Sequence, residues 1–547
     1  MTSGRRRLPA SRIVAAGAMA VMLPARAAEA PMPEADASGL PVYGQPATTP
    51  SQQRQPATVA EAPTASQRRG WFVVPSFSLL ETYTDNVGLK PGSGKESDLV
   101  TSLNPQLRVI GDTARLKLNL DYRRQQLFYA NESRNNSGLN FLNATGRFEA
   151  VENRVFIEGG GHITQSAISA FGAQPTSTEN VNGNRAEVRS FYLSPYVRGR
   201  FGSTADYEAR YRGTDTHASS NSLVNATVHD WTAMLKSSNE LATIGWRFDA
   251  QKQSSEFDTR RTLDLSRIRA SLLYRYQREL TFSLLGGYET NNYASASQEG
   301  RATYGIGVDW LPGPRTSAHG SAERGFFGDN HEVRLTHRTP LSSWELLDSR
   351  VVTILPNQLA QAPVGTAYDL LFNALASRIP DPIQRAQAVD RQLQLSGIPR
   401  DLGLVNSFLT NAAYVQRTHQ ASVALLGVRN TITFTAALGR REGITTVGGA
   451  SGDFATANVI DTRTISANWA HKLSAISSVN LLLSHFNNKG TSGTTVESTQ
   501  NLARVLLTHQ LSPRTTATLG VRYVNFTTTT GSGYTERAVT ASIATTF

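Results

Sequence analysis

Ten arginine residues carry the clearest chemistry in this 547-residue sequence, because each stands in a segment where polar and apolar residues alternate. If the apolar residues face outward, these arginines all face inward: Arg123, Arg198, Arg200, Arg210, Arg212, Arg247, Arg269, Arg275, Arg334 and Arg522. Guanidinium groups hold anions by paired hydrogen bonds, and rings of basic side chains in a pore favour anions. The arginines are therefore candidate pore-lining residues. Alternatively, they pair across strands with carboxylates such as Asp121, Glu208 and Asp309 and only stabilise the wall.

Motifs for catalysis or cofactor binding are weak. Gly92-Ser93-Gly94-Lys95 resembles part of a phosphate-binding loop, but Leu89 stands where the first glycine belongs. Gly305-Ile306-Gly307 lacks a third glycine, and the chain has no cysteine and no His-Glu-x-x-His. Three histidines on successive expected strands leave a serine–histidine pair open: His471, His485 and His509. We predict no enzymatic activity, no cofactor and no metal site.

Period-two alternation predicts the elements that position these residues. The clearest segments are 115–123, 242–248, 267–276, 301–310 and 517–523. Several end in Trp, Tyr or Phe, as the aromatic girdle of a transmembrane barrel requires. A soluble β-sandwich or β-helix also alternates, but long strands over residues 70–547 without any cysteine favour an outer-membrane β-barrel.

The C-terminal segment has the form of a closing barrel strand. Four apolar residues occupy one face of it: Val539, Ala541, Ile543 and Phe547. The intervening positions are mostly Thr and Ser. Strict alternation up to a terminal aromatic residue suits a strand with one face on lipid and the other on a polar lumen. We predict that these four residues form the C-terminal assembly signal that the barrel-assembly machinery recognises.

The N-terminal residues indicate export. Arg5, Arg6, Arg7 and Arg12 precede an apolar run, 13–23, and Ala25-Arg26-Ala27 supplies a cleavage site, which predicts a signal peptide at 1–27. The run is too short to span a bilayer as a helix. Residues 28–69 are rich in Pro, Ala and Gln, which predicts a disordered periplasmic leader. No later segment approaches 18 consecutive apolar residues, which excludes an inner-membrane helical bundle.

Connection lengths predict the orientation and number of strands. Short links alternate with longer polar ones at 83–98, 129–138, 167–186, 215–227, 441–457, 488–497 and 528–534. In outer-membrane barrels the short turns are periplasmic and the long loops external. Counts from the two ends agree only if 342–354 is a further strand after a hairpin through 326–330. The total is about 22 strands, within 20–24, and even as expected.

Residues 355–411 break the alternation. Ala367, Leu370, Leu371, Ala374 and Leu375 have helical spacing, and Asp381-Pro382 is a helix-start signal. The strand count places this helical insert outside the cell. A barrel of this size has a wide lumen, so we predict that the insert is an extracellular plug or lid. The alternative is a passive surface loop.

Several short motifs resemble one family. These are the opening segment 71–87, the hairpin Glu323–Gly328, the strand Leu335–Pro340 and the helical insert. Together they resemble the outer-membrane β-barrel proteins associated with PEP-CTERM/exosortase and exopolysaccharide loci of Gram-negative bacteria. The resemblance covers the mature chain and implies an outer-membrane location with a role in exopolysaccharide export or biofilm-matrix assembly. It supplies no catalytic residues.

The sequence thus predicts an all-β protein, a transmembrane antiparallel up-and-down barrel over residues 70–547 with a short helical insert. Its expected function is that of a porin or export conduit in the outer membrane of a Gram-negative bacterium. The alternative is a non-conducting structural, scaffolding or receptor barrel at the cell surface. The expected partners are outer-membrane lipid, the barrel-assembly machinery and an anionic polysaccharide, which the net charge of +11 suits, but not nucleic acid.

Overall fold

The computed structural model describes residues 70–174, 176–220, 225–239, 242–258, 260–354, 371, 372, 375, 385, 389, 408–410, 412–444, 452–491 and 495–547. The predicted signal peptide, the predicted leader and most of the helical insert lie outside these residues.

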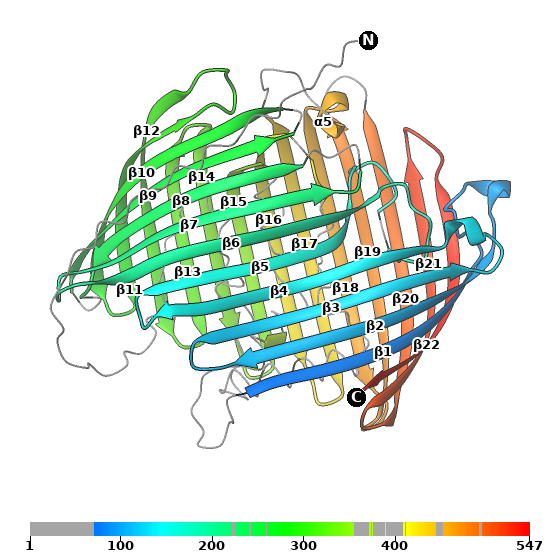
Figure 1. Ribbon diagram of the computed structural model, residues 1–547. Helices are drawn as coiled ribbons and strands as arrows, with labels where there is room; N and C mark the ends of the chain where they lie inside the picture. Colours follow the sequence, from blue (N-terminus) through cyan, green and yellow to red (C-terminus); the bar gives the residue numbers. More distant parts are fainter. Residues whose placement is uncertain are drawn as a thin grey trace, which may run out of the picture. The chain divides into compact units, whose positions relative to one another are not determined.

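The described residues form one 22-stranded sheet that closes into a barrel (Figure 1). The first half comprises β1 Gly70–Thr84, β2 Asp98–Asp112, β3 Leu116–Tyr129, β4 Ser137–Val151, β5 Val155–Ala167, β6 Arg185–Phe201, β7 Ala205–Ala218, β8 Ala226–Ser237, β9 Ile244–Phe257, β10 Arg260–Gln277 and β11 Leu280–Asn291. The second half comprises β12 Glu299–Gly313, β13 Thr316–Gly325, β14 Gly328–Arg338, β15 Ser342–Thr353, β16 Tyr414–Leu426, β17 Asn430–Gly443, β18 Val459–Lys472, β19 Ser477–Thr491, β20 Val496–Ser512, β21 Thr515–Thr528 and β22 Tyr534–Thr546.

Every strand pairs antiparallel with its neighbours in the sequence, and β22 pairs with β1. The register places Leu79 opposite Ile543, and the Phe547 amide donates to the Pro75 carbonyl at 3.0 Å. Closure pairs every strand with a neighbour on both sides, so no strand is left as a sheet edge. The predicted fold class is confirmed.

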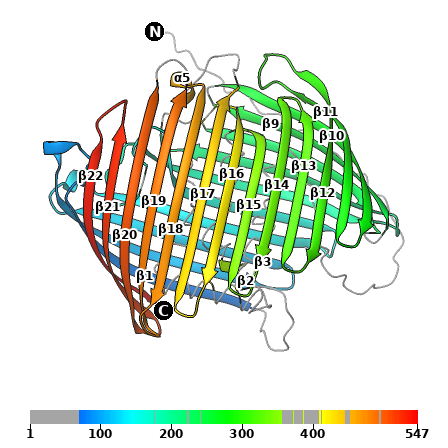
Figure 2. The same cartoon turned by 180° about the vertical axis from the view of Figure 1, so that it is seen from behind.

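The two ends of the barrel differ. At the turn end, where β1 begins and β22 ends, most connections are short, such as 113–115 and 202–204. At the loop end lie the longer connections, including 85–97, 168–184, 354–413 and 444–458. Figure 2 shows the strands from β9 to β22 running side by side between these two ends.

Strand β15 is the additional strand that the count required, and residues 326–327 form the tight turn of the expected hairpin. Several loops are shorter than predicted because the strands beside them are longer. Strands β6 and β10 contain 17 and 18 residues, and the connection predicted at 488–497 spans only 492–495. Polar residues beyond the apolar part of a strand still form backbone hydrogen bonds with the neighbouring strand. The strand therefore extends further along the chain than the alternation that predicted it.

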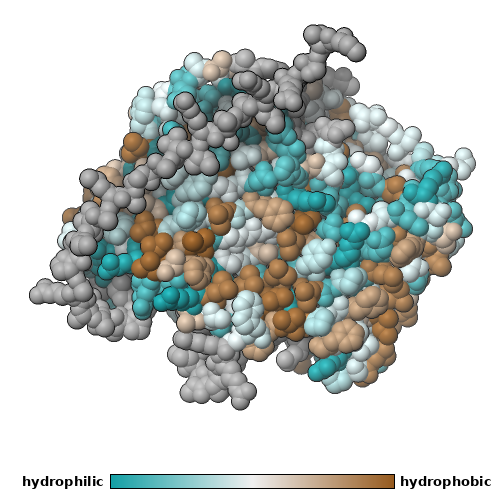
Figure 3. Space-filling model, viewed as in Figure 1, coloured by the Kyte–Doolittle hydropathy of each residue, from teal (hydrophilic) through white to brown (hydrophobic). Residues whose placement is uncertain are grey.

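Side chains alternate between an apolar outward face and a polar inward face. On β10, Ile268 is 65 % exposed while the adjacent Arg269 is 4 % exposed. Leu272, Leu284 and Ile306 are likewise exposed on the outward faces of their strands. Figure 3 shows such apolar side chains, in brown, gathered over the strands of one side.

Helices are minor in the described part of the chain. The four-residue helix α5, Asp453–Thr456, lies between β17 and β18, and no helix there is long and apolar enough to span a membrane. Within the insert, Leu371 and Leu375 are helical, as their spacing predicted, and so are Phe372, Arg385 and Val389. The remainder of the insert lies outside the described residues, so its role as a plug or lid stays a prediction.

The end of the insert meets the opposite side of the barrel. Phe408 forms a parallel bridge with Ala167, and the Leu409 amide donates to the Ala167 carbonyl at 2.9 Å. Ala167 ends β5, whereas residues 408–410 lead into β16, which is eleven strands away in the closed sheet of 22. The chain must therefore pass across the barrel opening to make this contact.

Candidate functional site: the barrel lumen and the loop that crosses it

All ten candidate arginines lie in the inward register of their strands. Arg123 belongs to β3, Arg198 and Arg200 to β6, Arg210 and Arg212 to β7, Arg247 to β9, Arg269 and Arg275 to β10, Arg334 to β14, and Arg522 to β21. This placement agrees with the alternation from which they were chosen.

Six of the ten contact carboxylates on the inward face. The pairs are Arg200–Asp206 at 2.7 Å, Arg210–Glu158 at 2.6 Å, Arg247–Asp249 at 2.8 Å, Arg269–Glu323 at 2.5 Å, Arg334–Glu345 at 3.5 Å and Arg522–Glu536 at 2.7 Å. Glu208 also pairs with Arg210, at 3.0 Å, but within β7 and not across strands as the alternative interpretation expected. Asp121 and Asp309 instead contact Gln106 and His319. Much of the inward positive charge is thus neutralised within the wall.

Three others lie over aromatic rings. The guanidinium carbon of Arg123 is 4.3 Å from the Phe141 ring centroid, that of Arg198 is 4.5 Å from Phe156, and that of Arg212 is 3.9 Å from Tyr192. These three and Arg275 have no carboxylate at ion-pair distance in the described part of the chain. An arginine over a ring keeps its charge and its free N–H groups for a ligand in the lumen.

Further inward arginines were missed by the sequence reasoning, and two of them, Arg108 and Arg504, have no carboxylate at ion-pair distance in the described part of the chain. Arg504 on β20 lies directly opposite Arg522, and its Nε and Nη2 atoms are buried without a hydrogen bond to the described residues. The Nε atom of Arg108 on β2 is in the same situation. Both stand in alternating segments, so the period-two pattern that selected the ten would also have selected these two.

The histidines do not form one site. His471 contacts Asn430 and His485 contacts Asn501, while His509 Nδ1 lies 2.8 Å from Ser477 Oγ. The last contact is an exposed serine–histidine pair, and no carboxylate orients His509 among the described residues. It therefore lacks the third group that holds a catalytic imidazole in place.

The glycine–lysine segment of the β1–β2 loop is not arranged as a phosphate loop. Residues Gly92–Gly94 form a single short helical turn. Lys95 Nζ donates to Thr535 Oγ1 at 2.7 Å and lies 3.4 Å from Asp85 Oδ2. The lysine thus ties this loop to β22 instead of facing a cradle of backbone amides.

The connection between β5 and β6, residues 168–184, crosses the barrel and is here called the lumen loop. Its first part contacts the far wall: Asn488 of β19 and Ser498 of β20 both donate to the Ala170 carbonyl, at 2.5 and 3.2 Å. The backbone amide of Gln174 donates to Gln500 Oε1 at 3.1 Å. By the shorter way around the sheet, β5 and β20 are seven strands apart. The lumen loop begins at the end of β5, so it contacts β20 only by passing through the barrel interior.

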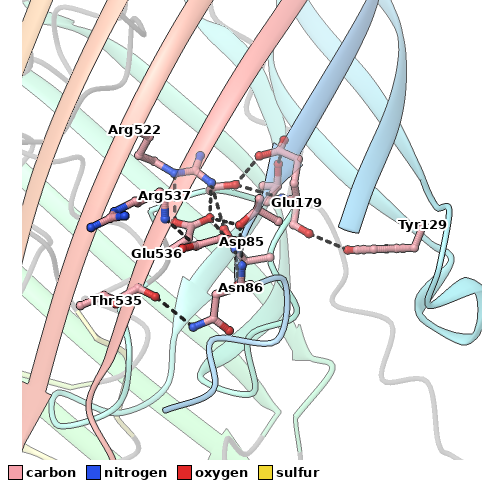
Figure 4. Close-up of polar contacts among 12 residues, drawn as sticks. Asp85, Asn86, Tyr129, Glu179, Arg522, Thr535, Glu536 and Arg537 are labelled. Atoms are coloured by element: carbon pink, nitrogen blue, oxygen red, sulfur yellow. Dashed lines mark hydrogen bonds and ion pairs between the residues drawn. The ribbon is translucent and has the colours of Figure 1, made fainter. Parts of the chain in front are cut away.

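A buried ion pair holds the second part of the loop. Asn180 Nδ2 donates to Glu536 Oε1 at 2.8 Å, and Arg522 Nη2 donates to Asn180 Oδ1 at 3.2 Å. Glu536 also accepts from Arg522 and from Thr84 Oγ1, at 2.7 and 3.0 Å. The Arg522 and Glu536 side chains are 8 % and 0 % exposed. We call Thr84, Asn180, Arg522 and Glu536 the clasp; Figure 4 shows its ion pair beside Glu179 and Asn86.

The loop also reaches β3 on its own side of the barrel. Gln125 Nε2 donates to Glu179 Oε1 at 3.2 Å. The Tyr129 hydroxyl donates to the Glu179 carbonyl at 2.9 Å (Figure 4). The lumen loop therefore has hydrogen bonds to β3 and β19–β22, which fixes it across the interior near the loop end. Alternation could not reveal this, because the loop is polar and its partners are distant in the sequence.

An apolar cluster seals one side of the loop. Phe171 packs in a buried group with Ala170, Phe408, Tyr414, Phe454 and Val496. The group joins the lumen loop, the end of the insert, α5 and the strands β16 and β20. Burial of these aromatic side chains adds a non-directional contribution to the hydrogen bonds that hold the loop.

Asp453 of α5 anchors the beginning of the lumen loop and should make the barrel sensitive to pH. It accepts hydrogen bonds from Ser169 Oγ and from the Ala170 amide, at 2.8 and 2.5 Å. Burial raises the pKa of Asp453, although these hydrogen bonds lower it in part. The folded chain therefore binds this proton more readily than the unfolded chain, and the free energy of unfolding should rise as the pH falls through this pKa. Unfolding in urea across pH should show this slope in the wild type and not in Asp453→Asn; an identical slope in both would contradict it.

Three of the four C-terminal signal residues share the outward face of β22, and Phe547 directly follows the strand. Val539, Ile543 and Phe547 are exposed large apolar residues, and Ala541 is exposed between them. The predicted alternation is present. Recognition by the assembly machinery stays a prediction.

Comparisons with known proteins give only distant likenesses. No protein-family model and no curated protein sequence matches the chain. Among solved structures, the FrpB iron transporter of Neisseria meningitidis (apoprotein, F5-1 variant) is 9 % identical over 88 % of this chain and 82 % of that chain, with a TM-score of 0.49. The siderophore receptor PirA of Pseudomonas aeruginosa is 11 % identical over 88 % and 82 %, with a TM-score of 0.42.

OccK3 (OpdO) of Pseudomonas aeruginosa is 11 % identical over 87 % of this chain and 96 % of that chain, with a TM-score of 0.29. Likenesses this low do not assign the chain to the receptors or to OccK3. The closed 22-stranded barrel therefore stands on its own strand register.

Proposed function

We propose that this chain is an outer-membrane barrel that conducts anionic solutes past a narrowing formed by the lumen loop, without catalysing a reaction. A closed sheet with apolar outward faces is one of the two structures that can span a bilayer. Short turns are periplasmic in such barrels, so the turn end would face the periplasm and the loop end the cell exterior.

The observation that carries the anion preference is a set of inward guanidinium groups with no carboxylate at ion-pair distance in the described part of the chain: Arg108, Arg123, Arg198, Arg212, Arg275 and Arg504. Asp121 and Asp230 lie directly opposite Arg108 and Arg212 and offset part of this charge, while their carboxylates accept hydrogen bonds from Gln106 and Gln251. Positive side chains in a narrow passage raise the local concentration of anions.

Among anions, we propose an exported polysaccharide as the solute. The resemblance to barrels of exopolysaccharide loci supports this choice, and guanidinium groups suit a polymer that carries carboxylates. Insertion would depend on the assembly machinery reading the C-terminal strand. Loss of extracellular polymer in a deletion strain would support the export role, and normal polymer would argue against it.

Neutralising three ring-stacked arginines tests the anion preference directly. The Arg123→Gln/Arg198→Gln/Arg212→Gln variant should move the reversal potential in a potassium chloride gradient toward that of potassium, because it removes three positive charges from the lumen. The matched control is Lys252→Gln, which removes a positive charge from the exposed outward face of β9 and should leave selectivity unchanged. Equal selectivity in the triple variant and the wild type would refute the proposal.

A non-conducting receptor or scaffold barrel is the second candidate. The observation in its favour is the firm seating of the lumen loop, which contacts β3 and β19–β22 and packs in a buried apolar cluster. A loop held in this way would form the base of a binding site that is open to ligands at the cell surface. Planar-bilayer recordings separate the two candidates, because a scaffold would insert without producing channels.

A further inference from the structure

Three arginines form a row on the outward face of β15, β16 and β17. The strand register places Arg350 directly opposite Arg417, and Arg417 directly opposite Arg440. Directly opposite side chains on one face of a sheet have Cβ atoms roughly 5 Å apart, and like charges there repel each other. Three arginines in such a row therefore raise the free energy of the folded state unless an anion binds between them.

The partners of the row leave its centre free. Arg350 donates to the carbonyl oxygens of Asp329 and Phe327 at 2.7 and 2.9 Å, which fixes its position. Arg440 lies 3.6 Å from Asp461. Arg417 is exposed and has no hydrogen bond or ion pair in the described part of the chain. One guanidinium is therefore held between two others and is available to a ligand.

The surroundings add charges of both signs. Glu442, opposite Val415, lies two residues beyond Arg440 toward the loop end on the same face. Lys489 continues the row beyond Asp461, and Arg463 lies one position closer to the turn end on the same face. Asp348, also one position closer, is occupied by two histidines: it lies 3.2 Å from His331 and 3.0 Å from His419.

The row stands at the upper edge of the apolar belt. Moving from it toward the turn end, the outward face passes Leu346 and Ala421 and then reaches Trp344, Val423 and Phe434. In the proposed orientation, the row lies where the headgroups of the outer leaflet meet the hydrocarbon. The strands that carry it lie together in Figure 2.

Cations on the opposite side of the barrel are arranged differently. On β6 and β7, Arg189 lies 2.6 Å from Glu187, and His217 lies 2.8 Å from Asp215. Those outward cations are matched by carboxylates on their own strands. The row of three arginines is therefore a local feature and not a general property of this level of the barrel.

We propose that Arg350, Arg417 and Arg440 bind the phosphate groups of a phosphorylated glycolipid of the outer leaflet. Guanidinium groups bind phosphate through paired, charge-assisted hydrogen bonds, and a lipid would also cover the apolar side chains below the row. The proposal rests on the membrane location and orientation proposed above, but not on conduction.

The test measures binding of bisphosphorylated lipid A to the full-length chain in phosphate-free detergent micelles by native mass spectrometry. The Arg350→Gln/Arg417→Gln/Arg440→Gln variant should bind it at least about tenfold more weakly than the wild type. The matched control, Arg189→Gln, should bind as the wild type does. Dephosphorylated lipid A should bind all three proteins weakly and equally.

Equal binding of lipid A to the triple variant and the wild type, or equal binding of the dephosphorylated lipid, would overturn the proposal. So would displacement of lipid A by inorganic phosphate at equal concentration, because the site would then be one for the free ion. Folding is checked by the gel mobility of unheated samples. If the triple variant does not fold, Arg417→Gln removes only the unpartnered guanidinium and should still weaken binding. Lipid binding without channel activity would refute conduction and leave this proposal standing.

Discussion

Removing the lumen loop should raise the single-channel conductance of the barrel severalfold. Ala167 and Arg185 pair directly at the ends of β5 and β6, so residues 168–184 can be replaced by a two-residue Asn-Gly turn that suits an antiparallel hairpin. The strands keep their register while the segment that crosses the lumen is lost. Planar-bilayer recordings of the purified variant and the wild type measure the effect.

The matched control shortens a loop that does not cross the interior. Residues 530–532 form an exposed tip between β21 and β22, and deleting them should leave the conductance unchanged. A second variant lacking residues 355–411 tests the predicted plug or lid. If conductance rises only in that variant, the insert is the obstruction and not the lumen loop. If neither deletion produces channels, the scaffold interpretation is correct.

Replacing Glu536 by alanine should lower the free energy of unfolding by about 3–5 kcal/mol, because it leaves the buried guanidinium of Arg522 without its counter-ion. The same change removes the acceptor for Asn180 and Thr84. The lumen loop should therefore loosen even where the barrel stays folded, and conductance should become noisier. Urea unfolding in micelles measures the first effect and bilayer recordings the second.

Two comparisons separate the clasp from ion pairing in general. The double variant Arg522→Met/Glu536→Leu should be more stable than Glu536→Ala, because no buried charge is left unpaired. Asp329→Asn breaks an exposed pair with Arg324, in which the two side chains are 75 % and 49 % exposed, and should not change stability measurably. A loss in Asp329→Asn as large as in Glu536→Ala would contradict a special role for the clasp.

Much of the fold follows from local pattern. Alternation in segments such as 267–276 predicted both the strand and the side that each residue faces, because a barrel strand separates two solvents at every second residue. The same rule placed Arg269 inward and identified β15 as an additional strand. Arg108 and Arg504 follow the same alternation, and they were missed only because they were not selected as candidates.

The candidate site was predictable only in part. Alternation indicates that an arginine points inward, but it does not indicate whether a carboxylate lies close enough to pair with it. Arg269 meets Glu323 from a strand three positions along the sheet, whereas Arg275 meets no carboxylate in the described part of the chain. Neighbouring inward side chains belong to different strands, so their pairing depends on register and not on local sequence.

By itself, the sequence determined the barrel, its closing strand and the inward face of the arginines, because these depend on contacts with solvent and lipid that repeat every two residues. Only the tertiary structure decided that residues 168–184 cross the lumen. The bond from Asn180 to Glu536 joins positions 356 residues apart, and Asn180 lies in a polar loop without periodicity. Such a contact exists only once the sheet has closed and brought β22 within reach of the loop after β5.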